Sequence, residues 1–288
     1  MRTPKTIKQI LEEGTSFLEA KGKENARSEA EKLIAFGLGL PRVDIYLNFD
    51  KPLAENELEV LRGHFKERVA GKPLQHIIGE VQFRYLKLKV NEHVLIPRPE
   101  TELIIDLALK AIKPDDRVLE LGTGSGCIAL SIAKEAKLQL DAAEISEEAL
   151  QIAKENARIN NVEGVNWLKS SWFEKVNKKY DVIIANPPYV SLQEYNNLPV
   201  EITKYEPKGA VTDEADGLKC LKEIIFEAPK YLKEKGSLLL EIGFDQEENV
   251  AELLKKAGFK KISFKKDLAG KTRFAVGQFP DKLAELGE

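Results

Sequence analysis

Residues 117–126 read RVLELGTGSG, an apolar run that passes directly into three glycines at alternate positions. Arg117–Leu121 has the composition of a short buried strand, and Cys127–Lys137 after it has that of a helix. The glycines have no side chains, so the backbone amides of this turn can approach a ligand closely. The N-terminus of the following helix points to the same place. The stretch therefore predicts the first strand–turn–helix unit of an α/β domain, with a ligand at the turn.

Strands and helices alternate along the rest of the chain, which predicts a mostly parallel sheet with helices on both faces. The last two strands have no helix between them, so they should form an antiparallel hairpin at the edge of the sheet. With the first strand, the expected sheet has seven strands, the others being 138–144, 165–169, 181–185, 237–242, 261–264 and 272–277. The helices expected between them are 147–160, 217–235 and 246–257.

The residues before this α/β region differ from it in pattern. Residues 1–75 show apolar side chains at helical spacing and predict a small helical bundle. Residues 76–95 alternate apolar and polar side chains, which indicates a β-hairpin that links the bundle to the α/β domain. A helix should then run from about residue 100 to 112, with Pro99 in its first turn. We therefore divide the chain into a helical domain (1–75), a hairpin linker (76–95) and an α/β domain (96–288).

Composition and charge narrow the class of protein. Hydrophobic residues make up 43% of the 288, and no apolar run approaches the length that spans a bilayer. The start of the chain lacks the apolar region of a secretory signal. Two cysteines cannot form a disulfide framework, which favours a reducing, cytoplasmic compartment. The net charge is −3 without a strongly basic region, so we expect no membrane partner and no nucleic-acid partner.

The glycine turn has features of a nucleoside site. Its spacing is GxGxG, unlike the GxGxxG that holds a pyrophosphate, so a ligand without a diphosphate fits better. Glu144 ends the second strand, where a carboxylate can accept hydrogen bonds from both ribose hydroxyls. Trp172 follows the third strand, and its ring either lies against an adenine or packs in the core.

The fourth strand ends in Asn186-Pro187-Pro188-Tyr189, on the same rim of the sheet as the glycine turn. Two consecutive prolines fix the backbone and leave only carbonyl groups beside the asparagine. The Asn186 side-chain oxygen and the Pro187 carbonyl can accept both N–H bonds of a planar NH₂ group. They would orient its lone pair and stabilise positive charge that develops on the nitrogen. Tyr189 can stack on the planar group.

Other catalytic arrangements find little support in the sequence. The three histidines, His64, His76 and His93, all precede the glycine turn, so the α/β domain has no Ser-His-Asp set of its own. No Cys/His cluster predicts a metal site. Cys127 and Cys220 are expected to be apolar buried thiols. Direct transfer of a group to nitrogen is the chemistry that remains.

The sequence resembles the class I methyltransferases that act on exocyclic nitrogen, and in particular the bacterial peptide chain release factor glutamine methyltransferases. The glycine turn, Glu144 and the Asn-Pro-Pro-Tyr motif carry the wider resemblance. Segments typical of the narrower family are Gln75–Glu80 (QHIIGE), Leu95–Glu102 (LIPRPETE), Trp172-Phe173, Tyr205–Pro207 (YEP) and Asp267–Arg273 (DLAGKTR). The resemblance covers residues 75–278 densely, and the helical region matches in type and length.

The resemblance implies a Rossmann-like methyltransferase domain that uses S-adenosyl-L-methionine. It implies methylation of the glutamine in the Gly-Gly-Gln loop of release factors, whose docking the helical domain would assist. Substrate contacts fall on Asn186, Pro187, Pro188 and Tyr189, of which the first two would be catalytic. Cofactor contacts fall on Gly122, Thr123, Gly124, Ser125, Gly126, Glu144, Trp172 and Asn186. The family usually has Asp at the positions of Glu144 and Ser171, and Ser171 lacks the carboxylate that could contact an adenine.

Three alternatives remain at this point. Adenine-N6 DNA methyltransferases share the Asn-Pro-Pro-Tyr motif, although they need a basic groove that this chain does not show. A sister family methylates glutamine in a ribosomal protein. A protein that keeps the cofactor fold for binding alone would have no reason to keep Asn186–Tyr189 intact.

Overall fold

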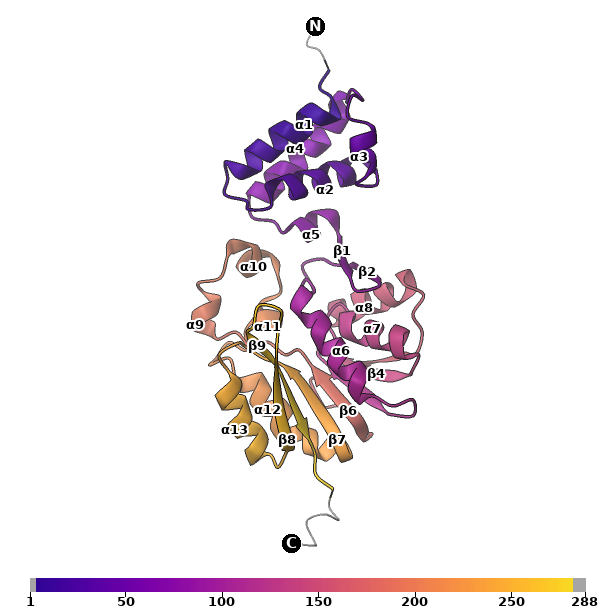
Figure 1. The fold of residues 1–288 in the computed structure, drawn as a ribbon, viewed down its shortest axis with the longest axis vertical. Coiled ribbons are helices and arrows are strands. Elements are labelled where there is room, and N and C mark those ends of the chain that lie inside the picture. Colours follow the sequence, from indigo (N-terminus) through magenta and orange to yellow (C-terminus); the bar gives the residue numbers. More distant parts are fainter. Residues whose placement is uncertain (1–3, 282–288) are drawn as a thin grey trace. The chain divides into compact units, whose positions relative to one another are not determined.

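The computed structural model describes residues 4–281, which form two compact units (Figure 1). Among the described residues, the first unit contains residues 4–79 together with Val200–Tyr205, and the second contains Glu80–Pro199 and residues 206–281. The sequence places the end of the helical domain at residue 75 and does not indicate that Val200–Tyr205 belongs with it. The division into docking, linking and catalytic parts stays a prediction.

The first unit is helical, as the apolar spacing predicts. Thr6 begins the first helix with a capping box, in which its hydroxyl accepts from Gln9 and the Gln9 side chain accepts from the Thr6 amide. Leu11, Leu33 and Leu61 lie at the centre of its core. The helices of this unit are α1 (Ile7–Glu19), α2 (Ala26–Leu38), α3 (Asp44–Leu47), α4 (Glu55–Val69), α5 (Leu74–Ile78) and α10 (Val200–Tyr205).

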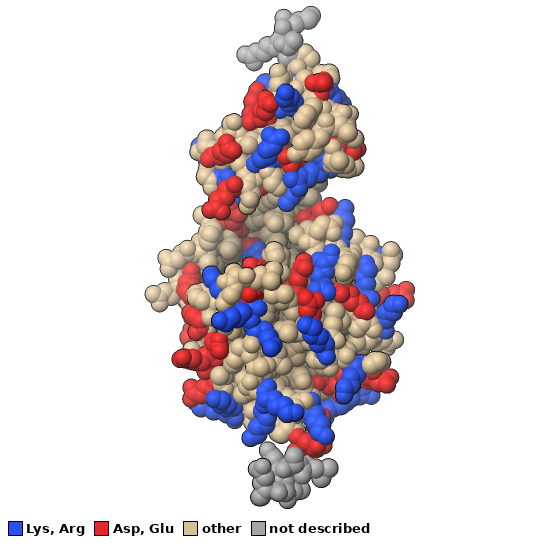
Figure 2. All heavy atoms as spheres, viewed as in Figure 1, with Lys and Arg blue, Asp and Glu red and all other residues tan. Residues whose placement is uncertain are grey.

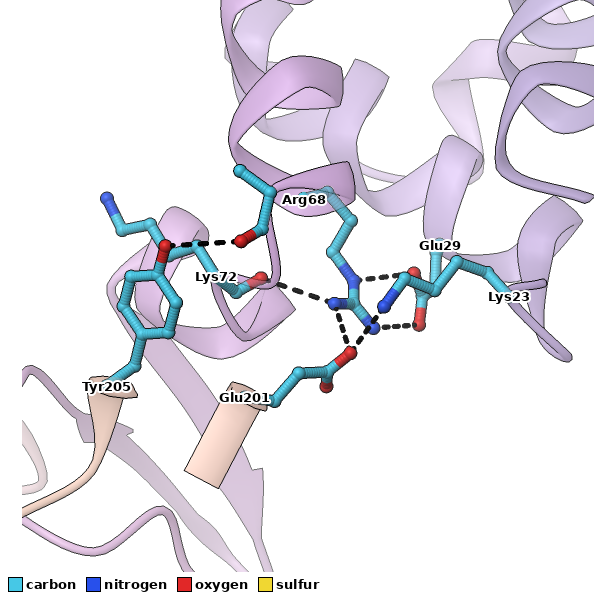
Figure 3. Close-up of polar contacts among 7 residues, drawn as sticks. Lys23, Glu29, Arg68, Lys72, Glu201 and Tyr205 are labelled. Atoms are coloured by element: carbon cyan, nitrogen blue, oxygen red, sulfur yellow. Dashed lines mark hydrogen bonds and ion pairs between the residues drawn. The ribbon is translucent and has the colours of Figure 1, made fainter. Parts of the chain in front are cut away.

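An ion-pair cluster within this unit holds α10 against α4 (Figure 3). Arg68 is 5% exposed and donates two hydrogen bonds to Glu29, at 2.7 and 3.0 Å, and one to Glu201, at 2.7 Å. Lys23 also pairs with Glu201. Burial opposes ionisation of Glu201, yet its hydrogen bonds with Arg68 and Lys23 lower its pKa below the ordinary value. Charge thus joins Val200–Tyr205 to helices more than a hundred residues earlier.

The second unit begins with the predicted hairpin, formed by β1 (Glu80–Phe83) and β2 (Leu86–Lys89) in antiparallel register. The fully buried side chain of Asn156 fastens this hairpin to the α/β domain. Its oxygen accepts from the Lys89 amide at 2.7 Å, and its nitrogen donates to the Lys89 carbonyl at 3.1 Å. The same nitrogen donates to the Ser125 carbonyl at 2.9 Å, so the hairpin and the glycine turn share one anchor.

A seven-stranded sheet forms the centre of the second unit, in the order β5-β4-β3-β6-β7-β9-β8. The first five strands of this order are parallel, and β9 pairs antiparallel with both β7 and β8, which confirms the predicted edge hairpin. The strands are β3 (Val118–Leu121), β4 (Leu140–Glu144), β5 (Val165–Lys169), β6 (Tyr180–Ala185), β7 (Leu232–Glu241), β8 (Lys260–Lys266) and β9 (Thr272–Gln278). From β3 the chain continues through β4 to β5 at one edge of the sheet, and it then returns to β6 on the other side of β3. Ligands bind at the point where the order of strands changes direction in this way.

Alternate residues of the central strands point to opposite faces, where two separate cores form. On one face Val118 and Val182 pack with α6 and α7, and on the other Leu119 and Ile183 pack with α12 and α13 (Figure 1). The helices of this unit are η1 (Pro99–Thr101), α6 (Glu102–Ala111), α7 (Cys127–Ala136), α8 (Glu147–Ile159), α9 (Leu192–Tyr195), α11 (Lys208–Val211), α12 (Lys219–Tyr231) and α13 (Glu247–Lys256).

One boundary in this region is wrong in the sequence prediction. The helix expected over residues 217–235 ends at Tyr231, and β7 begins directly at Leu232, five residues before the expected strand. Leu232 pairs with Tyr180, and the register then shifts so that Ser237 pairs with Val182. Charged residues at 233–235 interrupt the apolar pattern in this irregular part of the strand. The sequence pattern therefore does not indicate that the strand begins at Leu232.

Candidate active site

The glycine turn has the geometry that the sequence predicts. Gly122, Gly124 and Gly126 all have positive φ, between 54 and 83°, and α7 begins at the next residue. The amides of Gly122 and Thr123 both donate to the Ala143 carbonyl, at 2.8 and 3.1 Å, which ties the turn to β4. A side chain at Gly124 would meet nothing within 4 Å, so this part of the turn faces open space.

Gly126 has a different role from Gly124. A Cβ there would lie 3.1 Å from the Leu130 side chain and 3.2 Å from that of Ala153. The third glycine therefore allows α7 and α8 to pack closely, and it does not line the cavity that the other turn residues line.

Glu144 lies beside the turn at the end of β4, as expected. One carboxylate oxygen accepts from the Gly124 amide at 2.8 Å and the other from the Ser146 amide at 2.9 Å. The side chain is only 8% exposed. Two backbone donors thus fix the carboxylate, and each oxygen keeps capacity for a further hydrogen bond.

A cavity of about 550 Å³ lies at this rim of the sheet, inside the second unit. It brings together most of the residues predicted from sequence: Gly122, Thr123, Gly124, Ser125, Glu144, Trp172, Asn186 and Pro188. Pro187 and Tyr189 are not among its lining residues. Ser171 lines it as well.

Trp172 combines the two arrangements that the sequence left open. Its ring lies against the turn, since a Cβ at Gly122 would be 3.3 Å from it, and it lines the cavity. The same side chain packs on the core that faces α12 and α13. Its φ of +40° is unusual for a tryptophan, and strain of this kind gathers at functional sites.

A hydrogen-bonded chain that the sequence did not predict holds the Asn-Pro-Pro-Tyr motif. Asn186 Nδ2 lies 3.4 Å from Thr101 Oγ1, which donates to Glu241 Oε2 at 2.8 Å. The Tyr189 hydroxyl donates to Glu241 Oε1 at 3.2 Å. Thr101 and Glu241 are each 2% exposed, and burial raises the pKa of Glu241 above its ordinary value. The available signal was the position of Glu241, a carboxylate that ends a buried strand as Glu144 does.

A second carboxylate that the sequence analysis did not single out is Glu120, the last but one residue of β3. It lines the cavity, and it accepts from the Thr123 hydroxyl at 2.5 Å and the Ala129 amide at 3.0 Å. Burial raises the pKa of Glu120 to about 7. Burial also raises the pKa of the nearby Cys127 thiol, which keeps it neutral. The prediction that Cys127 and Cys220 are buried in the core is wrong, because both are only partly buried and line the cavity.

Two motifs that are distant in sequence meet at this site. Glu206, from the Tyr-Glu-Pro segment, accepts from the Ile96 amide at 3.0 Å and from Arg98 at 2.6 Å. Arg98 and Pro207 both line the cavity.

In the Asp-Leu-Ala-Gly segment, Asp267 accepts from the amides of Ala269 and Lys271, each at 2.9 Å, and so forms the tight turn between β8 and β9.

Among the described residues, no group of three or more possible ligands could hold a metal ion. No helix within residues 4–281 is both long and apolar enough to cross a membrane.

The fold and the cavity define a class I, S-adenosylmethionine-dependent methyltransferase, and the comparisons with known proteins agree. A methyltransferase from Pyrococcus furiosus has the same fold, with a TM-score of 0.51 and 22% identity over 68% of this chain and 90% of that one. The catalytic domain of hMettl16 has it too, with a TM-score of 0.55 and 18% identity over 76% of this chain and 83% of that one. Residues 100–202 match the methyltransferase small domain, and residues 9–79 match the PrmC N-terminal domain.

The chain belongs to the release factor glutamine methyltransferase family. The member from Geobacter sulfurreducens is 39% identical over 88% of this chain and 90% of its own length. The member from Rhodopirellula baltica is 36% identical over 94% and 95%. The member from Coxiella burnetii is 36% identical over 88% and 91%.

Proposed function

We propose that this protein transfers a methyl group from S-adenosyl-L-methionine to the side-chain amide nitrogen of the glutamine in the Gly-Gly-Gln loop of peptide chain release factors. The observation that carries this proposal is that Asn186 and Glu144 line one cavity beside an open glycine turn. Family membership over nearly the whole chain supplies the acceptor. Because release factors act in translation termination, we place the protein in the cytoplasm.

The residues present fit the cofactor. The cavity volume of about 550 Å³ lies within the range of small-molecule sites, roughly 300–1,000 Å³. Glu144, fixed by two amides, suits ribose hydroxyls, and the open space at Gly124 admits a ligand against the backbone. We assign the cofactor to Gly122, Thr123, Gly124, Ser125, Glu144, Trp172 and Asn186, with Gly126 acting through helix packing. When bound, S-adenosylmethionine supplies an electrophilic methyl group on a sulfonium.

The protein's own part in the reaction is to position and polarise the acceptor amide. An amide nitrogen is a poor nucleophile because its lone pair is delocalised into the carbonyl. The Asn186 side-chain oxygen and the Pro187 carbonyl would accept its two N–H bonds and stabilise positive charge on the nitrogen. Asn186 and Pro188 line the cavity on either side of Pro187, and we assign Tyr189 to contact with the planar amide.

The alternative acceptors receive less support. Figure 2 shows basic and acidic side chains interspersed over the visible face of each unit, without the continuous basic surface that duplex DNA requires. Glutamine in a ribosomal protein would suit the same chemistry, but the relatives that cover most of the chain carry the name of the release factor enzyme.

We assign the helical domain, residues 1–75, to docking of the release factor.

The test is transfer of labelled methyl from S-adenosylmethionine to a panel of acceptors. The panel contains a purified bacterial release factor, its variant with the loop glutamine changed to alanine, ribosomal proteins and duplex DNA. We expect label on the unmodified factor alone. Label on DNA or on ribosomal proteins instead would overturn the assigned acceptor while leaving the cofactor site intact.

A further inference from the structure

The side-chain amide of Asn186 can take two orientations, and the backbone of Asn186 does not select between them. The two ends of a side-chain amide have nearly the same shape, yet one end accepts hydrogen bonds and the other donates them. The proposed function, on which this inference rests, requires the oxygen to face the acceptor amide. A rotation of the Asn186 amide by half a turn would place N–H against N–H and remove the stabilisation.

We propose that Thr101 and Glu241 are positioning residues that fix the amide of Asn186 in its reactive orientation. The Thr101 hydroxyl has one hydrogen, and the 2.8 Å bond to Glu241 Oε2 uses it. Thr101 Oγ1 therefore turns a lone pair toward Asn186 and can pair only with its Nδ2, which lies 3.4 Å away. The Oδ1 of Asn186 is left for the cavity that Asn186 lines.

Burial makes this selection strong. Thr101 and Glu241 are each 2% exposed, and Glu241 does not line the cavity, so water offers this carboxylate no substitute partner. Thr101 lines the cavity together with Asn186. With the Asn186 amide reversed, its oxygen would face the lone pairs of Thr101 Oγ1 and a buried hydrogen bond would be lost. Leaving a buried donor or acceptor unpaired costs about 1–3 kcal/mol, which corresponds to roughly a 5- to 150-fold preference for the correct orientation.

The same carboxylate holds the other end of the motif. Tyr189 donates its hydroxyl to Glu241 Oε1 at 3.2 Å, so one group on β7 fixes both polar side chains of Asn186–Tyr189. No ion pair of Glu241 occurs among the described residues, and the nearby Arg273 pairs with Asp267. The charge of Arg273 acts on Glu241 without a direct ion pair, and a buried carboxylate that lacks such a pair costs stability. Its presence behind the reactive motif is explained by the two hydroxyls that it orients.

The experiment compares Thr101→Val, Thr101→Ser and Glu241→Gln in methyl transfer to a release factor. Thr101→Val keeps the shape and removes the hydroxyl, and Thr101→Ser keeps the hydroxyl. We expect Thr101→Val and Glu241→Gln to lower kcat about 30-fold, or about 2 kcal/mol, with KM for the factor and Kd for the cofactor changed less than about threefold. Thr101→Ser should stay within about threefold of the unchanged enzyme.

A matched control is Thr272→Val, which removes a similarly buried hydroxyl that donates to Glu247 at 2.6 Å, away from Asn186. It should lose stability without losing kcat. A second comparison uses Asn186→Asp, whose side chain presents oxygen in both orientations, so Thr101→Val should cost it less than about threefold.

Three results would overturn the inference. The first is an unchanged kcat in Thr101→Val. The second is a kcat in Thr101→Ser that falls as far as it does in Thr101→Val. The third is a fall in the kcat of Thr101→Val that is accompanied by equally weaker cofactor binding, or that is equalled by the fall in the kcat of Thr272→Val. The first would show that no orientation is set by Thr101. The other two would show that the site only needs packing or stability. A failure of the acceptor test alone would appear instead as no transfer to the release factor by the unchanged protein.

Discussion

Glu144 accepts a hydrogen bond from the backbone amide of Gly124 at 2.8 Å, so the carboxylate at the end of β4 and the turn after β3 form one rigid edge. We expect Glu144→Ala to weaken cofactor binding by about 1.5–3 kcal/mol, the range for hydrogen bonds to a charged group. Titration calorimetry with S-adenosylmethionine measures this. Glu147→Ala, at an exposed position three residues on, is the control and should bind normally. Equal affinity in both variants would remove Glu144 from the cofactor site.

Alanine substitutions at Gly124 and Gly270 would distinguish the effect of ligand contact from the effect of backbone strain. Both glycines have positive φ, 54° and 77°, and a Cβ at either meets no protein atom within 4 Å. Alanine at each should therefore cost a similar amount of stability, about 1 kcal/mol. Only Gly124→Ala should also weaken cofactor binding, by tenfold or more, because its methyl group enters the cavity. Thermal melts with and without cofactor test this, and an equal cofactor-induced shift in the two variants would contradict it.

The raised pKa of Glu120 predicts that the stability of the fold depends on pH. Its ordinary pKa of 4.5 applies to the unfolded chain, and burial raises the pKa to about 7 in the folded protein. Between these values the folded state binds more protons, so the free energy of unfolding should fall as pH rises from about 4.5 to about 7, and then level off. Glu120→Gln removes this dependence and should be about 3 kcal/mol more stable than the unchanged protein at pH 8 without cofactor.

Denaturant melts of both proteins from pH 4.5 to 8 would measure that difference. Parallel stability curves for Glu120→Gln and the unchanged protein would show that Glu120 is already ionised in the fold.

The ion pairs of Arg68 with Glu29 and Glu201 predict that charge stabilises the packing of α10 in the helical unit. Arg68→Ala leaves the carboxylates of Glu29 and Glu201 without their buried partner and should destabilise the helical unit by about 3 kcal/mol. Hydrogen exchange should become faster over Val200–Tyr205. Arg62→Ala removes an exposed pair with Glu55 on the same helix and should cost under about 0.5 kcal/mol. Unchanged exchange at α10 in Arg68→Ala would refute the role of this ion pair.

The sequence predicted those parts of the site that lie at strand ends. Gly122 and Glu144 each follow or end a buried strand, and the parallel arrangement brings such positions together at one rim. Local pattern therefore sufficed for the seven-stranded sheet, its antiparallel edge and those cavity residues that lie at or just after strand ends.

The missed features depend on contacts between distant segments. Thr101 reads as an ordinary first-turn residue until Glu241, 140 positions later, accepts its hydroxyl. Val200–Tyr205 looks like part of a loop, and only the pairing of Glu201 with Arg68, 133 positions earlier, assigns it to the helical unit. No periodicity or spacing records a partner at such a separation.

The most direct test of the central claim is tandem mass spectrometry of a release factor after incubation with the protein and S-adenosylmethionine. The account predicts one added methyl group, located on the side-chain amide of the loop glutamine and absent when Asn186→Ala replaces the unchanged enzyme. A methyl group on any other residue, or the same yield from Asn186→Ala, would contradict it.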